Sequence, residues 1–220
     1  MAVARDIPLK GFESGNEIKV MSIEQTVLIG CGIFREEVEH LSQTRGLHLN
    51  VEWLPVGLHD NIERLEAALE EAIAEQKQRG RRNIGLLFGQ GCLPLMKQFA
   101  QEHGVAVLSV KNCLAALVGD EELKTLEQNR TLVASPGWVR KMWLGRAGTA
   151  DGWTADDYRI QFGRYDLILV LDPGIEPLSD DEIITCFDLI QVPIETRACG
   201  LEHFFKVFGR LADDLERLPA

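Results

Sequence analysis

Short apolar runs alternate along the chain with longer segments whose apolar residues recur every three or four positions. The first pattern is typical of buried β-strands and the second of amphipathic helices. Strands are expected at 26–30, 47–53, 84–88, 105–110, 131–134, 167–171 and 192–195. Because strands that alternate with helices form βαβ units, the pattern predicts an α/β fold, a Rossmann-like and mostly parallel sheet with helices on both faces.

Local signals mark the ends of several predicted helices. Asp60 and Glu63 form a capping-box pattern before an apolar stripe, and Gly80 is expected to close that helix. Ser179 and Glu182 form the same pattern before the helix that leads to the last strand. A final helix is expected around residues 204–211.

The domain organisation predicted from the sequence is simple. Residues 1–24 are polar and are expected to be a flexible leader, and residues 25–220 are expected to form a single α/β domain. An insert at about 137–164 interrupts the alternation, and the pattern assigns it neither helix nor strand. The insert contains Trp138, Trp143 and Trp153.

Charge and composition exclude several functional classes. The 23 Lys and Arg residues against 34 Asp and Glu residues give a net charge of -11, which argues against nucleic-acid and anionic-membrane partners. No run approaches the about 20 apolar residues of a membrane helix. Five cysteines occur without an export signal, so reduced thiols in the cytoplasm are expected.

Cysteines follow several of the predicted strands. Cys31 follows the first strand, Cys92 the third and Cys113 the fourth. Because ligands of open parallel sheets bind beyond the carboxyl ends of the strands, these thiols are expected at one shared edge. Cys199 follows the seventh strand and is the fourth candidate, whereas Cys186 lies within a predicted helix and is expected to be a small core residue.

Thiolates with glycines beside them suit a metal centre. Helix N-termini are expected to lower the thiol pKa, and the adjacent glycines would let backbone N–H groups approach a ligand. These glycines are Gly30, Gly32, Gly89 and Gly91. Such a donor set predicts an iron–sulfur cluster, with zinc as the alternative. Cys199 or His59 would be the fourth ligand, or an open position would be left for a small ligand, and Trp138 would shield the centre from water.

Two other interpretations of the cysteines stay open. They could be catalytic thiols without a metal, or they could be packing residues at buried strand ends. Nearby turns offer weaker candidates, because Ser135 and Asp172 fit turn chemistry as well as ligand binding. The glycine-rich turns complete neither a dinucleotide fingerprint nor a phosphate loop.

These motifs resemble an uncharacterised prokaryotic family, the domain-of-unknown-function family numbered 1638. The resemblance covers most of residues 26–215 and rests on the segments 31–32, 54–59, 89–92, 112–119 and 137–138. Asn112 replaces an acidic residue of the family pattern, and no glycine follows Cys92. The resemblance implies an association with corrinoid-dependent methyl-transfer systems and therefore a metal-rich, anaerobic setting.

The expected function is that of a metal-binding accessory protein serving electron transfer or cofactor handling for a methyltransferase or redox partner. One alternative is a metal-free, racemase-like enzyme with two cysteines as acid and base. Another is a non-enzymatic partner of a corrinoid methyltransferase system. Whether the chain catalyses a reaction stays open. Phe204, Phe205 and Phe208 suit either the core or a contact in a homo-oligomer.

Overall fold

The computed structural model describes residues 25–147, 149 and 152–218, so the predicted leader at 1–24 lies outside the described residues. The chain forms two compact units. The first contains the described residues up to Ser109 together with those from Phe205 onward, and the second runs from Val110 to Phe204. Each unit has its own parallel sheet.

The first unit is built on a four-stranded sheet with the order β2-β1-β3-β4. Its strands are β1 (Thr26–Cys31), β2 (Val51–Leu54), β3 (Asn83–Leu87) and β4 (Ala106–Val107). All three pairings are parallel. The short helices η1 (Gly32–Phe34) and η2 (Leu58–Asp60) follow β1 and β2.

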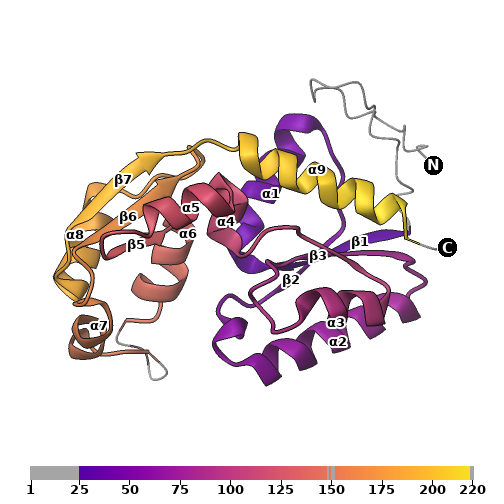
Figure 1. Ribbon diagram of the computed structural model, residues 1–220, viewed down its shortest axis with the longest axis horizontal. Helices are drawn as coiled ribbons and strands as arrows, with labels where there is room; N and C mark the ends of the chain where they lie inside the picture. Colours follow the sequence, from indigo (N-terminus) through magenta and orange to yellow (C-terminus); the bar gives the residue numbers. More distant parts are fainter. Residues whose placement is uncertain (1–24, 148, 150–151, 219–220) are drawn as a thin grey trace. The chain divides into compact units, whose positions relative to one another are not determined.

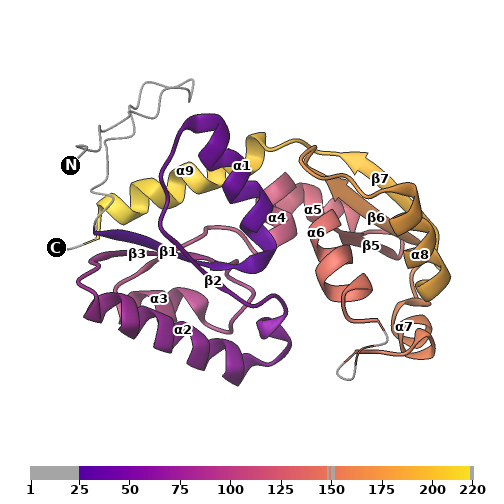
Figure 2. The same ribbon diagram turned by 180° about the vertical axis from the view of Figure 1, so that it is seen from behind.

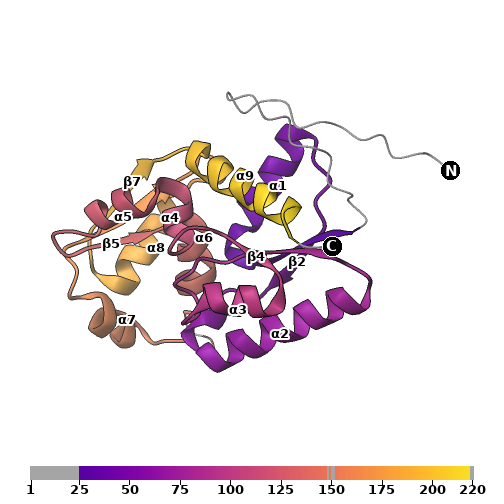
Figure 3. The ribbon, with the colours of Figure 1, turned by 45° about the vertical axis from the view of Figure 1, so that its right-hand side comes forward.

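Helices cover both faces of this sheet. They are α1 (Arg35–Arg45), α2 (Ile62–Gln78), α3 (Met96–His103) and the part of α9 (Glu202–Glu216) that belongs to this unit. In Figures 1 and 3, α2 and α3 lie on one face, and α1 and α9 lie on the other. This layering is that of a Rossmann-like unit.

The second unit has a three-stranded sheet with the order β5-β6-β7. Its strands are β5 (Thr131–Ala134), β6 (Leu167–Asp172) and β7 (Ile194–Ala198), and both pairings are parallel. The helices are α4 (Cys113–Val118), α5 (Asp120–Leu126), α6 (Pro136–Trp138), the π-helix η3 (Val139–Leu144), α7 (Ala155–Phe162) and α8 (Asp180–Ile190). In Figure 2, α7 lies beside α8, and the two helices are in contact.

The predicted α/β fold class, with parallel strands and flanking helices, is confirmed. Within the described residues, each of the predicted apolar runs overlaps a strand. What the pattern did not reveal is that these strands divide between two sheets. The alternation of strands and helices reports only local structure, whereas strand pairing depends on residues far apart in the chain.

Two local predictions at helix starts had different outcomes. The capping box of Ser179 and Glu182 is present at the start of α8. At the start of α2 the predicted cap is wrong, because Asn61 rather than Asp60 is the N-cap and its side chain accepts a hydrogen bond from the Arg64 N–H at 2.8 Å. The two neighbouring residues are both good N-caps, so the one-residue shift is small in energy.

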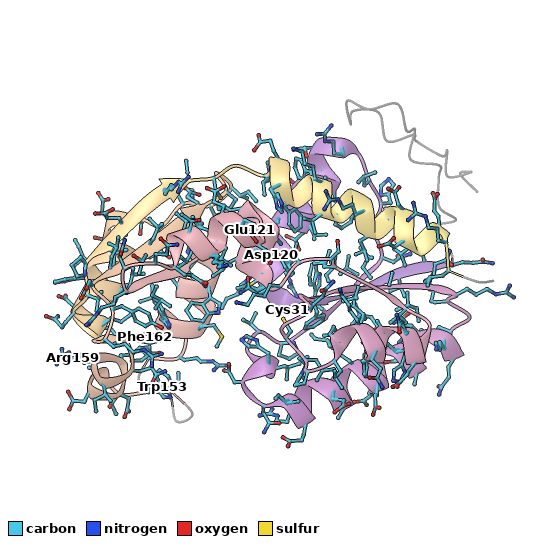
Figure 4. The ribbon with its side chains drawn as sticks, in the orientation of Figure 1. Cys31, Asp120, Glu121, Trp153, Arg159 and Phe162 are labelled. Atoms are coloured by element: carbon cyan, nitrogen blue, oxygen red, sulfur yellow. The ribbon has the colours of Figure 1, made fainter. Side chains whose placement is uncertain are left out.

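The segment at 137–164 contains helices to which the sequence pattern assigned no structure. Thr154 and Asp157 form a capping box at the start of α7, a signal that the sequence did contain. The aromatic residues of this segment pack together: the ring centroids of Trp143 and Phe162 lie 5.0 Å apart, and those of Trp153 and Phe162 lie 5.9 Å apart. Figure 4 labels Trp153 and Phe162 in this cluster. The segment thus contains an aromatic cluster, of which Trp153 is partly exposed.

Two glycines permit close packing in the first unit. A Cβ atom at Gly30 would lie 2.6 Å from Cζ3 of Trp53. A Cβ atom at Gly85 would lie 2.9 Å from Cδ2 of Leu28 and 3.1 Å from Cδ1 of Leu215, which belongs to α9. Gly85 therefore lets α9 approach the sheet closely.

No helix in the described part of the chain is long and apolar enough to span a membrane.

Candidate thiol site

Cys31 is the last residue of β1, where it pairs with Leu54 of the neighbouring strand β2. Its side chain is buried, with 8% of its surface exposed. The next residue is Gly32, where a Cβ atom would lie 3.2 Å from the Leu54 carbonyl oxygen and 3.3 Å from Cγ2 of Val56. The turn after β1 therefore runs tightly against the end of β2. Figure 4 labels Cys31 in this position.

Cys92 lies in the turn that follows β3, the strand on the other side of β1. Its backbone N–H donates to the Gly89 carbonyl at 3.0 Å, and its side chain is half-buried. Since β1 and β3 are parallel neighbours, Cys31 and Cys92 both occupy the carboxyl edge of the same sheet. This is the edge at which open parallel sheets bind ligands.

The electrostatic environment of Cys92 differs from the sequence-based expectation. Burial raises the pKa of the Cys92 thiol above its ordinary value, and a backbone hydrogen bond with Gly89 lowers it by less. The expected lowering by a helix N-terminus is wrong here, because α3 begins only at Met96. In metal-free protein the thiol therefore stays protonated at neutral pH.

His59 follows β2 and lies in η2. Its Nε2 atom is 3.6 Å from Oδ1 of Asp60, and 40% of its side chain is exposed. Given the order β2-β1-β3, the strands that precede His59, Cys31 and Cys92 are three consecutive strands of one sheet. Within the described residues, no three His, Cys, Asp or Glu side chains converge closely enough to hold a metal ion.

The other two candidate ligands belong to the second unit. Cys113 is the first residue of α4, which Asn112 caps by accepting a hydrogen bond from the Ala115 N–H at 2.9 Å. Cys199 follows β7, and its N–H donates to the Asp172 carbonyl of β6 at 2.9 Å. Both side chains are half-buried. Within the first unit, the strands that lead to candidate thiols are thus β1, which ends at Cys31, and β3, which precedes Cys92.

The chain matches the model of a known protein family. The model of the family DUF1638, described as a protein of unknown function, matches residues 53–208. The chain belongs to the DUF1638 family. This match covers His59, Cys92, Cys113 and Cys199, whereas Cys31 precedes it. Neither a curated protein nor a solved structure matches the chain.

Several other candidates in this DUF1638 member have local structural roles. Ser135 caps α6 by accepting a hydrogen bond from the Trp138 N–H at 3.2 Å, and the Asp172 carboxylate accepts one from the Gly174 N–H at 2.8 Å. The Trp138 ring packs edge-on against Trp143, with centroids 5.1 Å apart. These contacts account for Ser135 and Asp172 as a cap and a turn residue.

The fifth cysteine behaves as predicted from its helical context. Cys186 lies in α8 with 1% of its surface exposed, which confirms its position in the core. Burial raises the pKa of its thiol to about 12. Cys186 therefore provides a matched control for thiol chemistry elsewhere in the chain.

Proposed function

We propose that this DUF1638 protein is a metal-binding accessory protein with a cysteine-ligated centre. The centre is an iron–sulfur cluster, with zinc as the alternative, and it serves electron transfer or cofactor handling for a partner enzyme. The observation that supports this proposal is the position of Cys31 at the end of β1 and of Cys92 in the turn after β3, the adjacent parallel strand of the same sheet.

The chemistry of the two thiols suits a metal centre. The Cys31 side chain is buried and the Cys92 side chain is half-buried, and a buried thiolate is unfavourable without a compensating positive charge. A soft metal cation would supply that charge and displace the thiol protons. The raised pKa of Cys92 weighs against the metal-free alternative, because a cysteine that acts as a base must be ionised.

Further ligands are needed to complete a four-coordinate centre. His59 would supply an imidazole from the turn after β2, the strand beside β1. Cys113 and Cys199 are the remaining thiol candidates. None of the five cysteines forms a disulfide. The proposal therefore includes a cytoplasmic location, where thiols stay reduced.

The test is metal analysis of protein purified without oxygen. We expect a visible absorption band together with iron and acid-labile sulfide, or zinc in colourless protein. Cys31→Ser and Cys92→Ser should each reduce the bound metal at least severalfold, whereas Cys186→Ala should retain it. Single variants at Cys113, Cys199 and His59 then identify the remaining ligands.

Two results would overturn the proposal. One is wild-type protein that holds neither iron nor zinc after anaerobic purification. The other is a Cys31→Ser/Cys92→Ser double variant that binds as much metal as wild type. If metal-free protein contained one thiol that alkylates unusually fast, the two-cysteine enzyme would be favoured instead. Co-purification with a corrinoid protein at moderate salt would identify the class of the partner.

A further inference from the structure

A groove of about 450 Å³ runs along α8 in the second unit. One wall is apolar and consists of Leu144 at the end of η3, Ala147 and Ala155. Leu189 of α8 adds to this apolar lining from the opposite wall. Since the lining residues are half-buried or exposed, the groove is open to solvent.

The α8 wall of the groove carries two carboxylates. Asp181, Thr185 and Asp188 stand at intervals of four and three residues, so they share one face of the helix. All three are exposed. Among the described residues, neither the Asp181 nor the Asp188 side chain forms an ion pair, whereas Glu182 in the same wall is paired with Arg140. The Arg159 guanidinium donates to the Asp188 backbone carbonyl at 3.2 Å and lies 3.7 Å from the Asp156 carboxylate. The carboxylates of Asp181 and Asp188 themselves therefore stay available to a cationic side chain of a partner.

An apolar strip adjoins this acidic face. Ile184 is 57% exposed and Phe187 is 41% exposed, and the two residues stand three positions apart on α8. Ile184 follows Asp181 by three positions and precedes Asp188 by four, so it borders the acidic face. Adjacent exposed apolar side chains with a polar border are typical of a protein interaction surface.

We propose that the α8 surface, defined by Asp181, Ile184, Thr185, Phe187 and Asp188 with the adjoining groove, docks a basic amphipathic segment of a partner protein. An apolar side chain of that segment would enter the groove, and its Lys or Arg residues would pair with Asp181 and Asp188. This inference does not depend on the thiols and would stand without a metal centre.

Charge and shape together select this occupant. A small-molecule site buries most of its ligand, whereas this groove is open to solvent and its α8 residues Asp181, Thr185 and Asp188 are exposed. A second copy of the chain would bring a net charge of -11 toward another -11, which opposes association. A segment with alternating basic and apolar residues complements both the carboxylates and the apolar strip.

The probe is a fluorescent synthetic helical peptide of Leu and Lys residues, with Leu on one face, titrated with the full-length protein. We expect saturable binding, measured by fluorescence anisotropy, that weakens as salt is added. Asp181→Asn/Asp188→Asn should weaken binding about tenfold, an effect of the size expected for two lost charge pairs. Thr185→Arg should weaken it similarly, because it places a cation within the acidic face.

The matched control is Glu63→Gln/Glu66→Gln, which removes the same charge from the exposed face of α2. This variant should bind the peptide within about twofold of wild type, since only long-range attraction changes. The proposal is overturned if wild type shows no saturable binding, or if the control loses as much affinity as the α8 variants. Equal binding of a Leu and Glu peptide would also overturn it.

Discussion

Arg140 and Glu182 form a two-point ion pair, with Nε 2.6 Å from Oε1 and Nη2 2.9 Å from Oε2. The same guanidinium donates to the backbone carbonyls of Glu176 and Pro177 at 2.9 and 2.8 Å. Glu182 also accepts the Ser179 N–H at 2.9 Å as part of the capping box. This pair therefore joins the π-helix η3 to the start of α8.

Breaking this pair should destabilise the protein. We expect Arg140→Met to lower the free energy of unfolding by about 1–2 kcal/mol, because a hydrogen-bonded charge loses its partner. The expected loss of unfolding free energy is modest, because 28% of each of the two side chains stays exposed to water. Chemical denaturation measures the change. Glu75→Gln, which breaks the exposed pair with Arg79 on α2, is the control and should change stability by only a few tenths of a kcal/mol. Equal losses in both variants would contradict this account.

The same pair predicts a pH dependence. Hydrogen bonds from Arg140 are the largest cause that lowers the pKa of Glu182, from 4.5 to about 2. A carboxyl group with a lowered pKa in the folded state stabilises the protein above its ordinary pKa, and this contribution is lost as the pH falls from 4.5 to 2. Glu182→Gln should therefore reduce the slope of unfolding free energy against pH in that interval. An unchanged slope would show that other carboxyl groups dominate.

The contact between Gly85 and α9 predicts a steric effect. Gly85→Val should lower the free energy of unfolding by about 1–3 kcal/mol, because the added carbons meet Leu28 and Leu215. Leu215→Ala should relieve part of this clash, so the two changes should be non-additive by at least about 0.5 kcal/mol. A double-mutant cycle in urea measures this coupling. Strictly additive losses would mean that α9 does not contact the strand at Gly85.

Burial of the thiols predicts their reactivity. In metal-free protein, Cys92 should alkylate more slowly than a free cysteine at pH 7, because burial raises the pKa of its thiol. Its alkylation rate should rise with pH only above the pH at which an ordinary thiol ionises. Cys186 should react only after unfolding, since its pKa is raised to about 12 and it is almost fully buried. Mass spectrometry after timed alkylation with iodoacetamide separates the sites. Rapid labelling of Cys92 in folded protein at neutral pH would contradict this prediction.

Local signals in the sequence were sufficient for much of the secondary structure. The apolar run at 131–134 coincides with β5, and the pair Ser179 and Glu182 predicted the start of α8. Both succeed because side-chain alternation and helix capping depend on residues no more than a few positions apart. The capping box of Thr154 and Asp157 was equally available and would have located α7.

The candidate site was predictable only in part. Cys31 and Cys92 could be placed at one sheet edge, because parallel strands carry their carboxyl ends to the same side. The assignment of Cys113 to the second unit could not be predicted from the sequence, because β4 is short and the chain leaves the first unit directly after it. Nor could the raised pKa of Cys92, which reflects burial by residues from elsewhere in the chain.

Hydrophobic period and chain order were enough to predict the α/β class, most strand positions and the presence of thiols at strand ends. They could not predict that the strands form two sheets, that Arg140 pairs with Glu182 across 42 positions, or that a groove borders α8. These features depend on which distant segments meet, and that choice is made by packing and burial rather than by any local pattern.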